Sequence, residues 1–432
     1  MIGVGISAGL TGAKRARSIQ DPLPALDLDW ATDRSLPAAY GPTPSFSRAS
    51  TGTFFNSSGT LTTAAINAPR FNHVYNGSSW VSKGLLVEEQ RTNSVTKSNT
   101  FSAWSKNDAV VTSDSTTAPD GTANGDLVTF TASGAGLSRV IQISGFSNIS
   151  GTTYTKSIFV KSGTQRYFQI VFGSPFSSKF ANFDTQDKVA ATVSAGVTTS
   201  VTDCGNGWFR YSASVAATVT SSADQFWIYA VDSGTATWAP SSSTGGTMWL
   251  FGAQYETGDF ATSFIASDSG TAVTRSADVC QITGGDFSSF WNASEGSFVT
   301  EADSIGFAST GSDRYIIAFN SSGTANIAHA IFLPTTGLSF DVYNSTLQAR
   351  VSYTQPNAGD SFKLASCYKA NDFAATLNGS AVQTDTSGTV PTINNVGIGH
   401  YPSFNQYANC HIARLRYYPT RLTNAKLQEL ST

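Results

Sequence analysis

Glu88 and Glu89 are adjacent carboxylates in the most distinctive stretch of the sequence. A glycosidase places two carboxylates across one sugar bond. Neighbouring residues of a strand point to opposite faces, so these two side chains cannot flank one bond. We therefore expect no catalysis from this pair. One glutamate should pair with Arg91 or Arg48, and the other should be solvated.

Histidines and aspartates offer no further catalytic or metal-binding spacing. No nucleophile-elbow, zinc-protease or P-loop string occurs, although a triad assembled from distant parts of the chain stays open. Asp27 and Asp29 share one face of a short predicted strand, but calcium requires more oxygen ligands, so we expect a solvated edge. The sequence therefore predicts no metal site, no cofactor and no enzyme. The histidines are His73, His329, His400 and His411.

One predicted loop has the side chains that recognise a sugar. It joins a strand ending at Ile398 to one beginning near His411, and it carries Tyr401, Phe404, Asn405, Gln406 and Tyr407. Aromatic rings suit the apolar face of a sugar, and amides suit its hydroxyls. The alternative is that the rings fold inward or pack on a neighbouring subunit. The frequency of aromatic residues at interfaces favours this alternative.

A second loop, Thr237–Pro240, offers Trp238 as an exposed ring and a further glycan-binding residue. Three other tryptophans lie within strand patterns, and we expect them in the core: Trp208, Trp227 and Trp249.

Composition excludes several classes of function. The formal net charge is −3, without a basic surface for nucleic acid. No apolar run approaches the roughly 18 residues of a membrane helix. The first residues have their basic side chains after the apolar stretch, the reverse of a secretory signal. The cysteines lack framework spacing and should be reduced, with Cys367 and Cys410 the one pair to check for a bridge.

Short strands joined by polar turns dominate the chain. Alternation around Tyr211 predicts a half-buried strand, and the runs 167–172 and 226–231 predict strands that are buried more fully. Near the end, a strand precedes a helix over 423–430 that Thr423 caps, with Leu422 and Leu427 at staple spacing. At 432 residues, two or three domains are expected.

Several strings carry a family resemblance. Those at 46–53, 68–71 and 84–93 resemble the segment ahead of carbohydrate-binding-module-like domains in bacteriophage tail fibres and other virion structural proteins. The strings 99–104 and 248–256 resemble the first and last strands of such a jelly roll. The features from Val273 to the end resemble the concanavalin-like, laminin-G-like domain of phage fibres.

The resemblance implies an all-β fold, with two consecutive jelly-roll β-sandwiches preceded by an extended N-terminal arm. The implied units are an arm for virion attachment (1–45), a β-rich connecting segment (46–98), a carbohydrate-binding-module-like jelly roll (99–272) and a concanavalin/laminin-G-like jelly roll (273–432). Prolines between residues 22 and 44 favour extended chain in the arm.

The implied function is that of a virion structural protein: a fibre, spike or decoration subunit assembled in the cytoplasm of the host bacterium. Its partners would be other virion proteins, bound through the arm, and further copies of itself in a homo-oligomer. Its sandwiches would bind host surface polysaccharide without cleaving it. Two alternatives stay open, a purely architectural collar, head or tail component and a glycan depolymerase.

Overall fold

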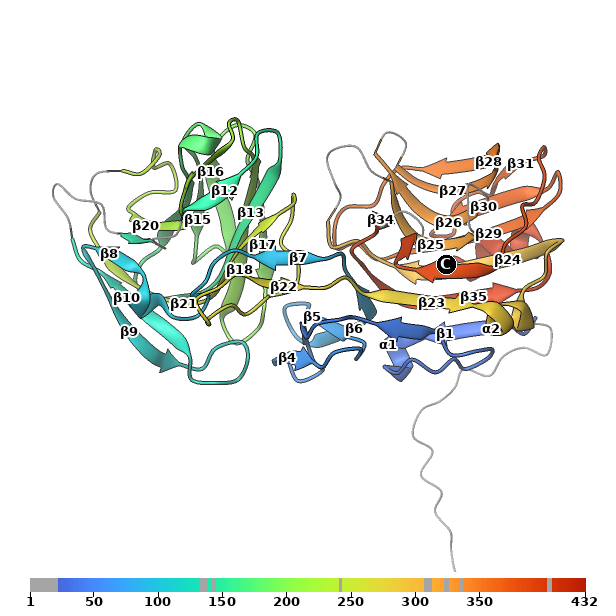
Figure 1. The fold of residues 1–432 in the computed structure, drawn as a ribbon, viewed down its shortest axis with the longest axis horizontal. Coiled ribbons are helices and arrows are strands. Elements are labelled where there is room, and N and C mark those ends of the chain that lie inside the picture. The colour runs from blue at the N-terminus through green and yellow to red at the C-terminus, as the bar shows by residue number, and fades with distance from the viewer. Residues whose placement is uncertain are drawn as a thin grey trace, which may run out of the picture.

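The computed structural model describes residues 22–132, 139–141, 145–240, 243–306, 313–321, 326–334, 337–401 and 406–432. Two β-sandwiches lie side by side along the long axis (Figure 1). Among these residues, helix is confined to short pieces: α1 (Trp30–Asp33), α2 (Gly284–Phe290), α3 (Asn424–Leu430) and the 3-10 turns η1 (Phe101–Ala103) and η2 (Ser174–Phe176). The predicted all-β class is confirmed. None of the helices described is long and apolar enough to cross a membrane.

The framework sandwich contains both ends of the described chain. Its first sheet consists, in spatial order, of β31 (Gln383–Asp385), β30 (Phe373–Leu377), β29 (Phe362–Lys369), β24 (Glu295–Ala302), β35 (Cys410–Tyr418), β6 (Trp80–Val87) and β5 (Phe71–Tyr75), with β1 (Leu26–Asp29) also beside β35. Its second sheet consists of β2 (Ser45–Ser47), β23 (Val279–Thr283), β32 (Asn395–Ile398), β25 (Arg314–Asn320), β26 (Asn326–Leu333), β27 (Gly337–Asn344) and β28 (Thr346–Tyr353). The short strands β33 (His400–Tyr401) and β34 (Gln406–Tyr407) join it beside β25.

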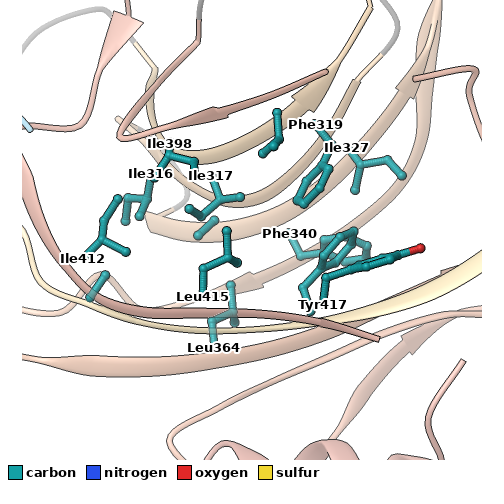
Figure 2. Packing of buried hydrophobic residues seen from close by; sticks show 14 of the residues in the cluster. Ile316, Ile317, Phe319, Ile327, Phe340, Leu364, Ile398, Ile412, Leu415 and Tyr417 are labelled. Carbon is teal, nitrogen blue, oxygen red and sulfur yellow. The ribbon is translucent and has the colours of Figure 1, made fainter. Parts of the chain in front are cut away.

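The core of this sandwich lies between its two sheets (Figure 2). One sheet contributes Ile316, Ile317, Phe319, Ile327, Phe340 and Ile398, and the other contributes Leu364, Ile412, Leu415 and Tyr417. At the end of the chain, the predicted helix is confirmed as α3, with the Thr423 hydroxyl accepting from the Lys426 amide. Leu422 and Leu427 belong to one buried cluster, as the staple spacing predicts.

Residues 26–30 belong to this core, so the prediction of an arm over 1–45 is wrong for them. β1 pairs antiparallel with β35, and Leu26, Leu28 and Trp30 are fully buried. The physical reason is the alternation of leucine with aspartate, which gives the strand one apolar face to bury. Residues 1–21 of the predicted arm lie outside the described residues.

The inserted sandwich consists of a junction sheet and an outer sheet. The junction sheet is β17 (Thr198–Asp203), β18 (Trp208–Ala216), β13 (Thr153–Ser162), β21 (Gly246–Thr257), β10 (Gly125–Phe130) and β9 (Ala109–Thr116). The outer sheet is β16 (Val189–Val193), β15 (Lys179–Asp184), β14 (Tyr167–Phe172), β20 (Trp227–Val231), β11 (Arg139–Ile141) and β8 (Ser105–Asn107). A separate pair joins β12 (Phe146–Asn148) to β19 (Ser221–Asp224).

The chain leaves the framework sandwich after β6 and returns to it at β23. The two crossings, β7 (Arg91–Asn93) and β22 (Val273–Arg275), pair antiparallel with each other. A further hairpin, β3 (Gly52–Phe55) with β4 (Leu61–Ala64), precedes β5. The predicted connecting segment over 46–98 is therefore not a separate unit, because β2, β5 and β6 are strands of the framework sandwich. The sandwich between the crossings is an insertion.

Candidate functional site

The hairpin of β33 and β34 carries the predicted recognition residues, but two of its rings are buried. Tyr401 is 1% exposed, with its ring centroid 4.7 Å from that of Tyr315. Tyr407 is 8% exposed, and its ring stacks on His400 at 5.4 Å. Of the two interpretations of these rings, the inward-folding one holds for Tyr401 and Tyr407, because β34 pairs with β25 as well as β33 and so lies along the sheet.

Other residues of that loop are placed only in part. Gln406 is half-buried, while Phe404 and Asn405 lie outside the described residues. Sugar binding by this loop stays a prediction.

Among the predicted recognition residues that the structure describes, Trp238 is the exposed one. Its side chain is 38% exposed over the face of the outer sheet that points away from the sandwich core. The Trp227 ring lies beside it, with centroids 6.3 Å apart and planes at 67°. Trp227 is half-buried on this outer face, whereas we expected it in the core. Tyr167 and Phe180 are half-buried in the same cluster, and we call these four rings the aromatic platform.

Strand register explains why these rings share one face. Val171 of β14 lies opposite Phe180 of β15 and opposite Trp227 of β20. Successive side chains alternate between faces, so Ile170 and Phe172 point into the sandwich core instead. Both faces of β14 are therefore apolar, as the sequence predicts for a more fully buried strand.

Two buried amides hold the loop that carries Trp238. Gln169 donates from Nε2 to the Thr237 carbonyl at 2.9 Å and accepts from the Ala239 amide at 2.8 Å. Asn182 donates from Nδ2 to the Ala236 carbonyl at 2.7 Å and accepts from Gln169 at 2.8 Å. Neither amide side chain is exposed. The loop is therefore fixed to the sheet on both sides of the tryptophan.

Sequence reasoning missed these two amides, although each left a signal. Gln169 interrupts the apolar run of β14, and Asn182 interrupts the apolar residues of β15. A lone amide within a buried strand must find hydrogen-bond partners, because burying it without them costs free energy. Such a residue indicates a loop or strand that it anchors.

The strings of the family resemblance meet at the junction of the sandwiches. They supply the five charged side chains of a buried group, which we call the junction cluster: Arg48, Arg70, Glu88, Arg275 and Asp278. Each of these side chains is at most 1% exposed.

Asp278 bridges Arg48 at 3.0 Å and Arg70 at 2.5 Å, while Glu88 bridges Arg70 at 2.7 Å and Arg275 at 2.6 Å. Burial alone would raise the pKa of Glu88, but Arg275 and Arg70 hold it well below its usual range. The five residues come from segments before and after the inserted sandwich, so the cluster joins both crossings.

The adjacent glutamates thus point apart, as predicted, but only one has the predicted environment. Glu89 forms an ion pair with Arg91. Glu88 is fully buried in the junction cluster and not solvated, because two arginines and Ser263 surround its carboxylate.

Among the histidines, His411 pairs with an acidic residue. His411 Nδ1 lies 2.8 Å from Asp303, and the Asn72 amide lies 2.8 Å from its Nε2. The Asn72 carbonyl oxygen accepts from the Phe55 amide, so its Nδ2 faces His411 and donates to Nε2. That nitrogen is therefore engaged in a hydrogen bond.

Asp27 and Asp29, the pair weighed for calcium, both bridge Arg414. Within the described parts of the chain, no three histidine, cysteine, aspartate or glutamate side chains group as metal ligands. The four cysteines are free and buried, Cys367 and Cys410 included.

Comparisons with known proteins give structural likeness alone. No family model matches the sequence. None of the curated proteins matches it. The CBM40 of the Ruminococcus gnavus IT-sialidase, bound to α2,3-sialyllactose, is 13% identical over 32% of this chain and 83% of its own, with a TM-score of 0.27. Trypanosoma rangeli sialidase is 8% identical over 90% of this chain and 98% of its own, with a TM-score of 0.27. The LG4-5 domains of the mouse laminin α1 chain are 11% identical over 77% of this chain and 92% of their own, with a TM-score of 0.22.

These matches correct one prediction. We expected no enzyme, but sialidases are among the structures that match. The prediction that the chain is not an enzyme is therefore withdrawn. At such low identities and TM-scores, the likeness carries no argument for a sialidase activity, and the fold assignment rests on the sheets themselves.

Proposed function

We propose that this chain is a bacteriophage virion structural protein, a fibre, spike or decoration subunit, and that its inserted sandwich binds host surface glycan on the aromatic platform. The observation that carries the glycan part is the half-exposed Trp238 ring on a loop that Gln169 and Asn182 anchor. Aromatic faces stack on the apolar side of sugar rings. A ring that is held in place beforehand loses little entropy on binding.

The virion part is supported by the sequence resemblance at the strings of the junction cluster. We place attachment to other virion proteins in residues 1–21, since residues 26–30 pack within the framework sandwich. Deleting residues 1–21 should leave a folded chain that no longer joins the particle. A truncated chain that incorporates normally into particles would contradict this attachment.

The glycan part is tested on a glycan array that carries bacterial surface polysaccharides. The wild-type chain should be retained on at least one polysaccharide, and Trp238→Ala should weaken retention by about tenfold or more. Trp238→Phe should restore part of it. Tyr40→Ala is the matched control, because Tyr40 is also exposed (46%) but lies in the framework sandwich. Retention that is equal in wild type and Trp238→Ala would refute the platform.

The same polysaccharides separate the alternatives. Release of reducing ends from a retained polysaccharide would assign a depolymerase. An architectural component without a glycan ligand would give no retention at all.

A further inference from the structure

A cavity of about 470 Å³ lies between the two sandwiches. Both sandwiches line it: β17 and β18 from the inserted sandwich, and β5, β6 and the β3–β4 hairpin from the framework side. Residues 259–264, which follow β21, line it as well. This volume lies in the usual range of about 300–1,000 Å³ for small-molecule sites.

One wall of the cavity is a surface of hydroxyl side chains on the junction sheet. Register places Ser200 beside Ser212 and Thr198 beside Ser214, and all four residues line the cavity. A sheet face covered by another module normally carries large apolar side chains that fill the space. Here the side chains are small and polar, so the space stays open and is lined with groups that both donate and accept hydrogen bonds.

The framework side and the 259–264 segment supply aromatic rings. Phe54, Phe55, Trp80 and Phe260 line the cavity and are all half-buried. The Trp80 and Phe55 rings stack with centroids 4.9 Å apart. Trp80 also reaches the inserted sandwich at Gly205, where an added Cβ would come within 3.0 Å of the indole. The cavity therefore combines aromatic surface with hydroxyl surface.

The charges of the lining disfavour an anionic ligand, since Asp203 and Asp259 line the cavity as well. Among the described lining residues, Arg210 alone is a lysine or arginine. Its two terminal nitrogens already donate to the Thr262 carbonyl at 2.5 Å and to the Ser157 hydroxyl at 2.9 Å. Glu88 is neutralised by Arg70 and Arg275. An anionic sugar would find no free cation among these groups.

We propose that this cavity is a second carbohydrate site, which binds the end of an uncharged saccharide. A pyranose has an apolar face for the Trp80 and Phe55 rings and hydroxyls for the Ser200 and Ser212 row. The junction cluster fixes the two walls relative to each other, so the site is formed before the sugar arrives. The inference rests on the proposed glycan-binding function, and it adds a site that selects a chain end.

Saturation-transfer NMR with the full chain tests it, using methyl glycosides of glucose, galactose, mannose and rhamnose as probes. At least one glycoside should receive transfer from the wild-type chain. Ser200→Trp places a large ring on the exposed edge strand β17 and fills the cavity, and Trp80→Ala removes its aromatic wall. Each variant should weaken glycoside binding by about tenfold or more.

Thr112→Trp is the matched control for the filling variant. Thr112 is an exposed residue on β9, the opposite edge strand of the same sheet, and it does not line the cavity. Thr112→Trp should bind the glycoside as wild type does. No transfer from wild type to any glycoside, or binding that Ser200→Trp leaves unchanged, would overturn the cavity site.

The two proposals fail separately. Retention of polysaccharide that Trp238→Ala abolishes, without glycoside binding, would uphold the platform and overturn the cavity site. Glycoside binding that Ser200→Trp abolishes, with polysaccharide retention indifferent to Trp238→Ala, would uphold the cavity site and refute the platform.

Discussion

The Trp238 loop and the β33–β34 hairpin share an aromatic composition but differ in where their rings point. Tyr401 and Tyr407 are almost fully buried, whereas Trp238 keeps 38% of its surface exposed. The hairpin is held by backbone pairing to β25, which lays its side chains along the framework sheet. The Trp238 loop is held by side-chain amides from the sheet beneath it, and this leaves its own side chain free to point outward.

The difference shows that aromatic content alone does not identify a binding loop. What decides is how the loop is attached. Backbone pairing makes the loop a further strand of the sheet. Its rings then alternate between the two faces, as side chains do in any strand. Attachment through buried amides fixes the backbone without determining the direction of each side chain. The comparison therefore predicts opposite responses to mutation in the two loops.

The largest effect on stability is expected from Tyr401→Ala. Removing a buried aromatic side chain costs about 3 kcal/mol or more through lost burial and the cavity that remains. The free energy of unfolding, measured by urea denaturation, should fall by that amount, and Tyr401→Phe should recover most of it. Retention on polysaccharide should not change. Unchanged stability would show that the ring is free, and the comparison between the two loops would fail.

A smaller loss of stability is expected from Gln169→Leu. The leucine removes hydrogen bonds to Thr237 and Ala239 and leaves buried loop groups unpaired, at a cost of about 1–3 kcal/mol. Polysaccharide retention should fall as well, because the Trp238 loop loses its anchor while keeping its ring. Gln165→Leu is the control, since Gln165 is a buried amide whose bonds go to Tyr167 and Val231 outside that loop. If retention falls equally in both variants, anchoring is not the cause.

Much of the fold could be predicted from the sequence, because its signals are local. Period-two alternation, polar turns and the Thr423 cap each act within a few residues, and they predict the all-β class and α3. The insertion could not be predicted in this way. It depends on pairing between β1 and β35, nearly the full length of the chain apart, and no local pattern encodes that distance.

The candidate site was predictable only in part for the same reason. Trp238 stood out because it lies in a short predicted loop and not in a strand pattern. Trp227 did not stand out, because its strand is apolar on both faces. Without alternation of polar and apolar residues, the sequence does not show which face a side chain occupies. The residues of the junction cluster lie in the strings that carry the family resemblance, but the contact between Arg48 and Asp278 forms only in the tertiary structure, across the whole insertion.

Acid should weaken the framework sandwich while leaving the platform intact. Burial lowers the pKa of His400 to about 4 and that of His329 to about 3, below their ordinary value near 6.5. Between pH 6.5 and these values, the unfolded chain binds protons that the folded chain does not, so the free energy of unfolding falls as pH falls. Each histidine contributes up to about 1.4 kcal/mol per pH unit.

Urea denaturation at pH 7 and pH 5.5 measures this loss. His400→Phe keeps a ring against Tyr407 and should reduce the pH dependence without abolishing it, since burial also lowers the pKa values of His329 and His73. All four histidines lie in strands of the framework sandwich, so polysaccharide retention should be the same at both pH values. Identical pH dependence of the free energy of unfolding in wild type and His400→Phe would show that His400 does not contribute to the loss of stability in acid.

The smallest effect on stability is expected from Trp238→Ala. The ring is partly exposed, and its contacts include an edge-on neighbour, Trp227, and a long hydrogen bond of 3.4 Å to the Phe172 carbonyl. Truncation should cost about 1 kcal/mol or less, because the amide anchors of the loop stay in place and little burial is lost. Urea denaturation of Trp238→Ala beside Tyr401→Ala measures the contrast directly. A loss of stability as large as that of Tyr401→Ala would mean that the Trp238 ring packs as a structural part of the outer sheet. The ring would then not be available to stack on a sugar, and the platform proposal would fail.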